Sequence, residues 1–372
     1  MDKRIISIAL SILVVVFVAA LKAEESSLLK LAETLFAVPS PTGYEEPMFE
    51  VIQGILPPES QTMRDNLGSL YLKLGNQNSQ LAICTPMDEA GYFVSGVNPQ
   101  GYLRIDKAVF GSPLIDSYHL GHPMIVWTEN GPIEGVLALP SLHILSSEVR
   151  KEFQERPGLE LAFLDIGVGS EDEAREKGVI MLDAVTPWRE LTRLAGNKIA
   201  GHSLGLKFCT ALVLDVAKRV ATKSTTSNPT FVWMAQTKFP LRRSRPRSAL
   251  GALRASAEIE AKSIVIVDVF SCDAEDQTGI TIGNGPVLVY SGDGATKIRD
   301  RIQELAQNRG LPLQVAPDHS SSVMNPFLSK HEEIIGIFLP VKFSQTPSEV
   351  VDTKDADTLS FLLSALLQEG GM

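Results

Sequence analysis

The stretch Leu81-Ala-Ile-Cys-Thr-Pro-Met-Asp-Glu-Ala-Gly-Tyr-Phe-Val94 decides the fold of this chain. Its first five residues are an almost continuous apolar run, which is typical of a strand covered on both faces of a sheet. The run ends in a loop that carries Asp88 and Glu89. Because ligands in open α/β sheets bind outside the carboxyl ends of the strands, we expect the chemistry of the protein at residues 86–89.

The flanking segments extend this pattern into an α/β domain. Residues 25–36 place apolar side chains at the spacing of one helical face, and residues 203–221 do the same. Residues 231–235, 263–270 and 335–343 are apolar runs with the length of buried strands. We therefore predict an α/β domain built from residues 24–89 and 184–372.

Between these two parts, the sequence changes character. From about residue 90 to residue 183, short alternating runs are separated by Gly, Pro and Asn. This spacing predicts an inserted β-rich domain, formed as a small barrel or sandwich.

The N-terminus has the features of an export signal. Lys3 and Arg4 precede an apolar run over residues 5–21, and the small residues Ala20 and Ala23 lie near its end. We predict that residues 1–23 are a signal peptide, so that the protein is exported to the periplasm or the extracellular space. The alternative is an uncleaved anchor that holds the protein to a membrane through residues 5–21.

Composition limits the classes of partner. The 372-residue chain is 44% hydrophobic and 21% charged, as in globular proteins, and its formal net charge is −10. An acidic protein repels phosphate backbones, so nucleic acid is excluded as the main partner. The three cysteines, Cys84, Cys209 and Cys272, match no metal-binding spacing and are predicted to be small buried hydrophobes.

Three motifs occur in the same order as in one known family. They are Pro39-Ser-Pro-Thr-Gly-Tyr-Glu45, Asp65-Asn-Leu-Gly-Ser-Leu70 and Pro86-Met-Asp-Glu89. Through them the chain resembles the glutamyl/deblocking aminopeptidases and cellulase-M-like proteins, a family of di-zinc metallopeptidases that form tetrahedral assemblies. The resemblance implies an α/β/α domain with a mixed sheet, an inserted small β-barrel-like domain, peptide ligands and a homo-oligomer.

The resemblance also assigns the metal site, and most of its ligands are replaced here. The family's five ligand positions fall on Pro86, Gly201, Lys238, Asp268 and Gln345, and its general base falls on Thr237. Only Asp268 keeps a metal-binding side chain. Asp88, which in the family orients the first histidine ligand, is also retained. We therefore expect no bound metal cofactor, and we expect Lys238 to pair with Asp268 instead.

Two functions remain open. The first is a catalytically inactive pseudopeptidase that acts by binding or assembly. The second is an exported metallo-aminopeptidase that removes N-terminal residues from peptides at an altered zinc or cobalt site. His202, together with Asp88 and Asp268, is the one set that could hold a single ion.

Two further segments carry reactive or charged side chains. Residues 318–322 contain Asp318, His319 and serines, but the run contains no Gly-x-Ser-x-Gly motif and is predicted to be a polar loop. Lys238, Arg242 and Arg243 begin a basic cluster, which is either a solvated loop or a site for an anion or acidic peptide.

Overall fold

The computed structural model describes residues 26–75, 79–108, 116–141, 143–155, 158–222, 228–239, 248–273, 278–290, 296–317 and 321–368. The predicted signal segment and the arginines of the basic cluster lie outside these ranges, as do Asp318 and His319. None of the described helices is both long and apolar enough to cross a membrane.

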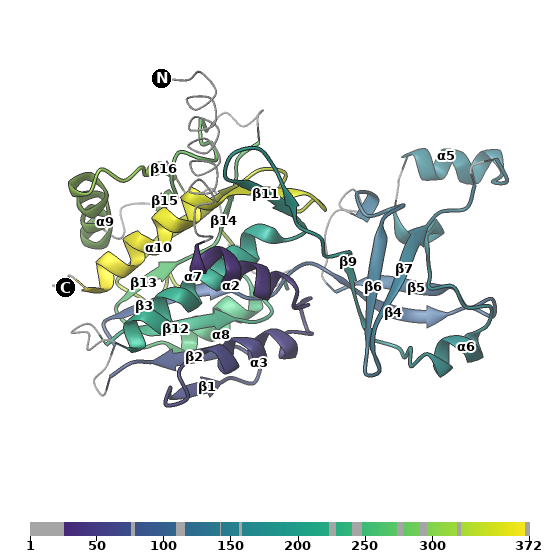
Figure 1. Ribbon diagram of the computed structural model, residues 1–372, viewed down its shortest axis with the longest axis horizontal. Coiled ribbons are helices and arrows are strands. Elements are labelled where there is room, and N and C mark those ends of the chain that lie inside the picture. The colour runs from purple at the N-terminus through teal and green to yellow at the C-terminus, as the bar shows by residue number, and fades with distance from the viewer. Residues whose placement is uncertain are drawn as a thin grey trace, which may run out of the picture.

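A nine-stranded mixed sheet forms the centre of the larger domain (Figure 1). Its main path runs in the order β1-β2-β12-β3-β13-β17-β15-β16, and β14 pairs with β17. The strands are β1 (Thr62–Arg64), β2 (Leu70–Lys73), β3 (Leu81–Pro86), β12 (Thr230–Met234), β13 (Ser263–Ile266), β14 (Val269–Ser271), β15 (Val287–Tyr290), β16 (Gln314–Pro317) and β17 (Glu333–Val341). Strands β12, β3, β13 and β17 are parallel, so their carboxyl ends share one edge.

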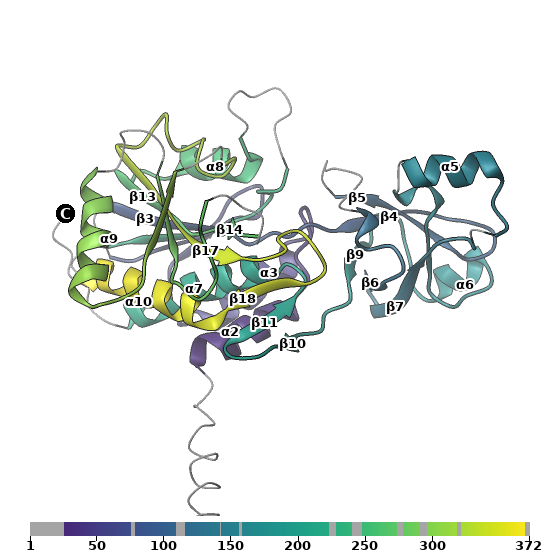
Figure 2. The same cartoon turned by 90° about the horizontal axis from the view of Figure 1, so that it is seen from above.

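Helices cover both faces of this sheet because its strands are apolar on both sides. Ile83 packs in a core with helices from one face, whereas its neighbours Ala82 and Cys84 pack in a second core on the other. The first face is covered by α2 (Ser27–Phe36), α3 (Glu46–Ile55), α7 (Leu204–Ala221), α9 (Thr296–Asn308) and α10 (Thr353–Gln368). The second is covered by α8 (Leu250–Glu258), which lies opposite α7 and α10 in Figure 2. The predicted α/β/α fold with a mixed sheet is confirmed.

A smaller sheet joins the site region to the C-terminal helix. It contains β10 (Thr192–Arg193), β11 (Lys198–Gly201) and β18 (Glu349–Asp352), in that order. The antiparallel pairing of β11 with β18 places Gly201 opposite Glu349.

The inserted domain is a closed six-stranded barrel with a core of its own. Its strands follow the order β4-β5-β8-β7-β6-β9, and the domain also carries α5 (Ser147–Glu155), η1 (Leu159–Leu161) and α6 (Glu171–Glu176). The strands are β4 (Tyr92–Val97), β5 (Leu103–Lys107), β6 (Pro123–Thr128), β7 (Gly131–Ala138), β8 (Phe163–Asp165) and β9 (Ala184–Pro187). The predicted boundary at residue 183 is wrong by one strand, because β9 closes the barrel between β4 and β6.

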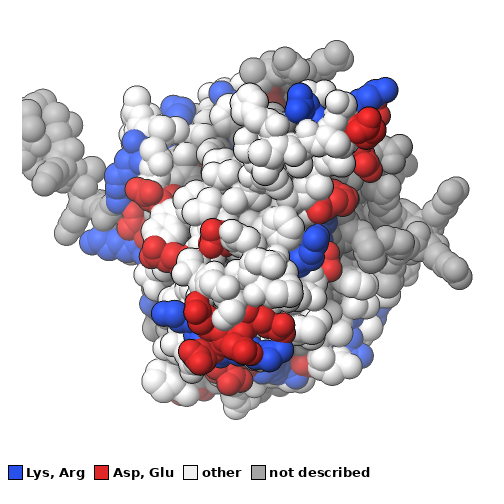
Figure 3. Space-filling model, turned by 90° about the vertical axis from the view of Figure 1, so that its right-hand side faces the viewer, with Lys and Arg blue, Asp and Glu red and all other residues white. Residues whose placement is uncertain are grey.

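The outer face of the barrel domain agrees with the acidic character of the chain. Figure 3 shows acidic side chains gathered near the lower edge of this face, among a largely uncharged surface. In the described chain, the first turn of α6 alone contributes Glu171, Asp172 and Glu173. Such a surface repels rather than attracts a phosphate backbone.

Candidate functional site

The five positions that the family resemblance assigns to metal ligands lie at or near the carboxyl edge of the central sheet. Pro86 ends β3 beside Met234, the last residue of β12. Thr237 and Lys238 follow β12, and Asp268 follows β13. Gly201 ends β11, and Gln345 lies between β17 and β18. The central sheet therefore places Pro86, Thr237, Lys238 and Asp268 at or after the carboxyl ends of neighbouring strands, whereas Gly201 and Gln345 lie next to the smaller sheet.

Asp88 is fully buried and holds two loops together. Its Oδ2 atom accepts hydrogen bonds from Thr42 Oγ1 at 2.7 Å and from the Lys238 N–H at 2.9 Å. Its Oδ1 atom accepts a hydrogen bond from Thr237 Oγ1. The residue at the general-base position thus donates to a carboxylate, and Asp88 fixes the loop after β12 against the loop after β3.

Asp268 is buried and receives only partial compensation for its charge. Its Oδ1 atom accepts the N–H of Val269 at 2.8 Å. Burial raises the pKa of Asp268, and the nearby positive charge of Lys238 opposes that rise. The predicted salt bridge is not formed, since no ion pair within 4.0 Å joins Lys238 to Asp268 in the described chain. Lys238 acts on this carboxyl group through its field rather than by contact.

Two of the positions that the resemblance assigns to metal ligands are structurally closed. Pro86 is buried, and its carbonyl accepts a hydrogen bond from Thr210 Oγ1 of α7 at 3.0 Å. At Gly201, an added Cβ would lie 3.0 Å from side-chain atoms of both Phe36 and Leu191. Contacts this short force neighbouring atoms to move. Aromatic and aliphatic side chains therefore crowd the position that the family assigns to its bridging carboxylate.

The fifth position also fails to supply a metal-binding side chain. Gln345 is exposed and has a positive φ of 64°. Its N–H donates to Glu349 Oε1 at 2.9 Å, and Glu349 Oε2 accepts the N–H of Gly205 at 3.0 Å. Glu349 thus ties this loop to the N-terminus of α7. Burial raises the pKa of Glu349 to about 7.

The residues at this edge do not fit a pair of divalent ions. Such a pair needs several carboxylates and imidazoles that converge on it, one of them bridging. Among the described residues, no group of three or more His, Cys, Asp or Glu side chains is arranged to hold a metal ion. The prediction that His202, Asp88 and Asp268 could hold a single ion is wrong for the same reason.

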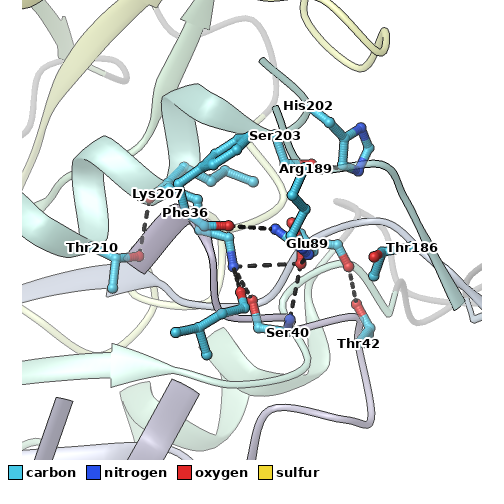
Figure 4. Close-up of polar contacts among 12 residues, drawn as sticks. Phe36, Ser40, Thr42, Glu89, Thr186, Arg189, His202, Ser203, Lys207 and Thr210 are labelled. Atoms are coloured by element: carbon cyan, nitrogen blue, oxygen red, sulfur yellow. Dashed lines mark hydrogen bonds and ion pairs between the residues drawn. The ribbon is translucent and has the colours of Figure 1, made fainter. Parts of the chain in front are cut away.

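Beside this edge, a buried carboxylate meets two cations of the chain itself. Glu89 Oε1 forms an ion pair with Arg189 and lies 3.4 Å from Lys207 Nζ (Figure 4). Lys207 also donates to Val38 O at 2.8 Å and to Ser40 Oγ at 2.7 Å. Burial alone would raise the pKa of Glu89, but the two cations lower it to about 2. Burial lowers the pKa of Lys207 to about 7.

His202 lies between this cluster and the barrel domain. Its Nε2 atom lies 3.1 Å from Ser203 Oγ, and its ring meets the ring of His119 edge-on at 5.6 Å. His119 Nδ1 in turn lies 2.6 Å from the hydroxyl of Tyr92 on β4. These contacts connect the two domains. Burial lowers the pKa of His202 to about 4, so the imidazole is neutral near pH 7.

A cavity opens next to the loop that carries Thr237. It measures about 310 Å³ and is lined by acidic residues that include Glu45 and Asp65, and by Gln236. Glu45 Oε1 accepts the N–H of Gln236 at 2.9 Å, and burial raises the pKa of Glu45 to about 7. Arg64 also lines the cavity and is paired with Glu46.

Sequence reasoning missed Lys207, Arg189 and the contact between Ser203 and His202. A signal for Lys207 was available, since it is three residues after Leu204 and four before Ala211 on the buried face of α7. A lysine on such a face needs a buried partner. No comparable signal marks Arg189, which follows the barrel in an irregular segment.

Comparison with known proteins agrees with the geometry of the fold. The chain is 24% identical over 354 residues to lysyl aminopeptidase of Pyrococcus furiosus, covering 91% of this chain and 96% of that protein. Its structure matches the TET1 peptidase of Pyrococcus horikoshii with a TM-score of 0.80 at 21% identity, over 92% of this chain and 100% of that one. It matches the aminopeptidase APDkam598 of Desulfurococcus kamchatkensis with a TM-score of 0.75 at 20% identity, over 92% and 95% of the two chains.

The sequence pattern of one family extends over most of the chain. The family described as M42 glutamyl aminopeptidase matches residues 68–362, which include the central strands and most of α10. Every position that the resemblance assigns to a metal ligand, from Pro86 to Gln345, lies inside this range. The protein therefore belongs to the M42 glutamyl aminopeptidase family.

Proposed function

We propose that this protein uses the peptidase fold to bind peptides without metal-dependent hydrolysis. The observation that carries the proposal is the set of side chains at the metal edge. Of the five positions that the resemblance assigns to ligands, only Asp268 retains a carboxylate or imidazole. Lys238 adds a positive charge whose field reaches Asp268 and Glu349. The chain thus compensates part of its own buried negative charge with a lysine.

Energetics favour this function over catalysis. A structural zinc site contributes on the order of 10 kcal/mol from about four ligands, which one carboxylate cannot supply. Thr237, at the general-base position, is an alcohol that donates to Asp88. Loss of a positioned base slows a reaction by about 10²–10⁴-fold even when the rest of a site is intact.

The acidic cavity beside the edge offers a place for the amino end of a peptide. Glu45, Glu46 and Asp65 line it against one cation, Arg64, which Glu46 already pairs. An ammonium group placed there is attracted by Asp65, and by Glu45 in the molecules in which that carboxyl group is ionised. This arrangement supports binding of positively charged peptide ends.

Metal content and hydrolysis together test the proposal. Purified protein is analysed for metals and then assayed on a panel of aminoacyl substrates, with and without added zinc, cobalt or manganese. We expect no stoichiometric metal and no turnover, while peptides with a free amino end bind measurably by calorimetry. Near-stoichiometric metal, with turnover that a chelator abolishes, would contradict the proposal.

An active aminopeptidase is the second candidate. The observation in its favour is that proteins similar to this chain along almost their whole length, including lysyl aminopeptidase of Pyrococcus furiosus, are named aminopeptidases. A single ion held at Asp268 would serve this function. The same assay decides between the candidates, since only this one predicts chelator-sensitive release of N-terminal residues.

Export and assembly complete the proposal. The charged and apolar N-terminal segment supports export, and mass spectrometry of native protein should find a new N-terminus within residues 20–24. An intact Met1 in a soluble cytoplasmic fraction would contradict export. The TET1 peptidase of Pyrococcus horikoshii can assemble into a tetrahedron or a large octahedral shell. Its likeness to this chain supports a homo-oligomer.

A further inference from the structure

The turn between β11 and α7 has a feature that the metal-site assignment does not use. Its sequence, Gly201-His-Ser-Leu-Gly205, is a Gly-x-Ser-x-Gly motif. Its structure is a strand followed by a sharp turn and a helix, since β11 ends at Gly201 and α7 begins at Leu204. This is the structural setting in which the motif presents a nucleophilic serine.

The backbone of the turn has the strain and the close contacts that the motif requires. Ser203 has φ 50° and ψ 26°, a left-handed conformation that is uncommon for residues other than glycine. At Gly205, an added Cβ would lie 2.6 Å from Val341 Cγ2 and 2.7 Å from Val269 Cγ1. Only glycine fits there, so the turn depends on this motif residue.

The serine hydroxyl contacts an imidazole instead of capping the helix. Serine at the N-cap usually accepts a backbone hydrogen bond from the first turn, but the side chain of Ser203 does not. Its Oγ atom lies 3.1 Å from His202 Nε2. A hydroxyl within hydrogen-bond reach of an imidazole is the arrangement that activates a serine as a nucleophile.

The imidazole is buried next to the cluster of Glu89, Arg189 and Lys207, whose charges act on it. His202 is 4% exposed, and its Nδ1 atom has no hydrogen-bond partner among the described residues. The charge of Glu89 acts on His202 and favours its protonated form, although burial has the larger, opposite effect. The edge-on ring of His119 fixes the imidazole from the barrel side. His119 is thus a positioning residue for His202, whereas Glu89 acts on the imidazole through its charge (Figure 4 shows His202, Ser203 and Glu89).

We propose that Ser203 is an acyl-transfer nucleophile and that His202 is its general base. Ser203 Oγ attacks the carbonyl carbon of an ester while its proton passes to His202 Nε2. The ester C–O bond breaks, and the proton leaves with the alcohol. Water then attacks the acyl-serine and gives a proton to the same nitrogen. The bond between Ser203 Oγ and the acyl carbon breaks, the proton returns to Ser203 Oγ, and the carboxylic acid is released. The Leu204 N–H, next to the nucleophile, is placed to stabilise the oxyanion.

The surroundings define the class of substrate. Ser203 is 6% exposed, and apolar side chains crowd both glycines of the motif. A bulky acyl group does not fit such a site without movement of the core. The site therefore suits short acyl esters, and the reaction needs neither metal nor redox cofactor.

A fluorophosphonate probe and 4-nitrophenyl acetate test the proposal on the full chain. We expect one probe adduct per chain on the peptide that contains Ser203, and a burst of about one equivalent of nitrophenolate, both unaffected by chelator. Ser203→Gly should abolish both while tolerating the positive φ. His202→Gln should slow labelling by about 10²-fold or more. Ser329→Ala, a change at an exposed serine away from the turn, should label as the parent does.

Clear outcomes would overturn the proposal. Labelling that persists in Ser203→Gly would do so, as would labelling of His202→Gln at the parental rate. A folded parent protein that forms no adduct with the probe would also overturn it. Circular dichroism and urea unfolding of each variant separate loss of the nucleophile from loss of the fold. Because the readout is independent of metal, it stands or fails separately from the proposal on peptide binding.

Discussion

Phe36 and Leu191 crowd the Cα of Gly201, the position that the resemblance assigns to a bridging ligand. A Cβ added at Gly201 would lie 3.0 Å from the side chains of both Phe36 and Leu191. We expect Gly201→Ala to destabilise the protein by about 1–3 kcal/mol, because it overpacks the core. Gly54→Ala in α3 is the matched control, since its Cβ meets nothing within 4 Å. It should stabilise by about 0.5–1 kcal/mol through helix propensity. If urea unfolding shows that both substitutions change the free energy of unfolding in the same direction, the packing at Gly201 is loose.

The buried carboxylate Glu89 balances two cations. Glu89→Gln leaves Arg189 and Lys207 buried without an opposite charge, and we expect a loss of about 3–5 kcal/mol in the free energy of unfolding. Glu171→Gln is the control, because its pair with Arg175 is on the surface. It should cost less than about 1 kcal/mol. A cost below about 1 kcal/mol for Glu89→Gln would mean that the cluster admits water.

At the scale of elements, Glu349 couples two segments through one carboxyl group. It joins the N-terminus of α7 to the loop before β18. Burial raises its pKa from 4.5 to about 7 in the folded protein. The folded state therefore holds a proton that the unfolded state releases between these values. The contribution of the Glu349 carboxyl group to the free energy of unfolding is complete below pH 4.5. It is lost as the pH rises through 7, a change of about 3 kcal/mol.

Glu349→Gln tests this pH dependence. The variant should reduce the fall in unfolding free energy between pH 4.5 and 7.5, although Glu45, whose pKa is also about 7, keeps part of it. The exposed control Glu332→Gln should preserve the full fall. Urea unfolding across this range is the measurement, and an unchanged slope in Glu349→Gln would contradict the assignment.

The elements of the sheet could be predicted from sequence more fully than the contacts at its edge. The apolar run at residues 81–85 covers all of β3 except its last residue, and the run at 263–270 contains β13, because burial on both faces leaves a continuous signal. Strand β9 was assigned to the wrong domain, since Ala184–Pro187 is also buried and apolar in character. The bond from Thr237 to Asp88 spans 149 residues, and no local pattern encodes such a pairing.

The whole molecule carries an exposed apolar segment on its barrel domain. Ile180, Met181 and Leu182 are 56%, 64% and 71% exposed. Hydrogen bonds from Leu182 N to Val94 O and from Ile180 N to Asp183 Oδ2 hold this segment in place. In a homo-oligomer such a patch is expected to lie between subunits.

We expect Met181→Asp to lower the molar mass of the assembly at least twofold by light scattering after gel filtration. Ile144→Asp, a change at another exposed apolar residue of the same domain, should leave the mass unchanged. A monomeric parent protein, or an assembly that tolerates Met181→Asp, would place the contact elsewhere.

In the sequence, the barrel domain is inserted between β3 and β12, and this order affects how the chain folds. Strand β12 lies between β2 and β3, and Ala82 pairs with Thr230. When β3 emerges from the ribosome, both of its neighbours are still to be made. The barrel uses only its own strands and is complete as soon as β9 appears. The nascent chain therefore contains a complete barrel while both edges of β3 are still unpaired, because the strands that pair with β3 are synthesised later. Such non-local pairing slows folding and favours a chaperone that covers β3 until then.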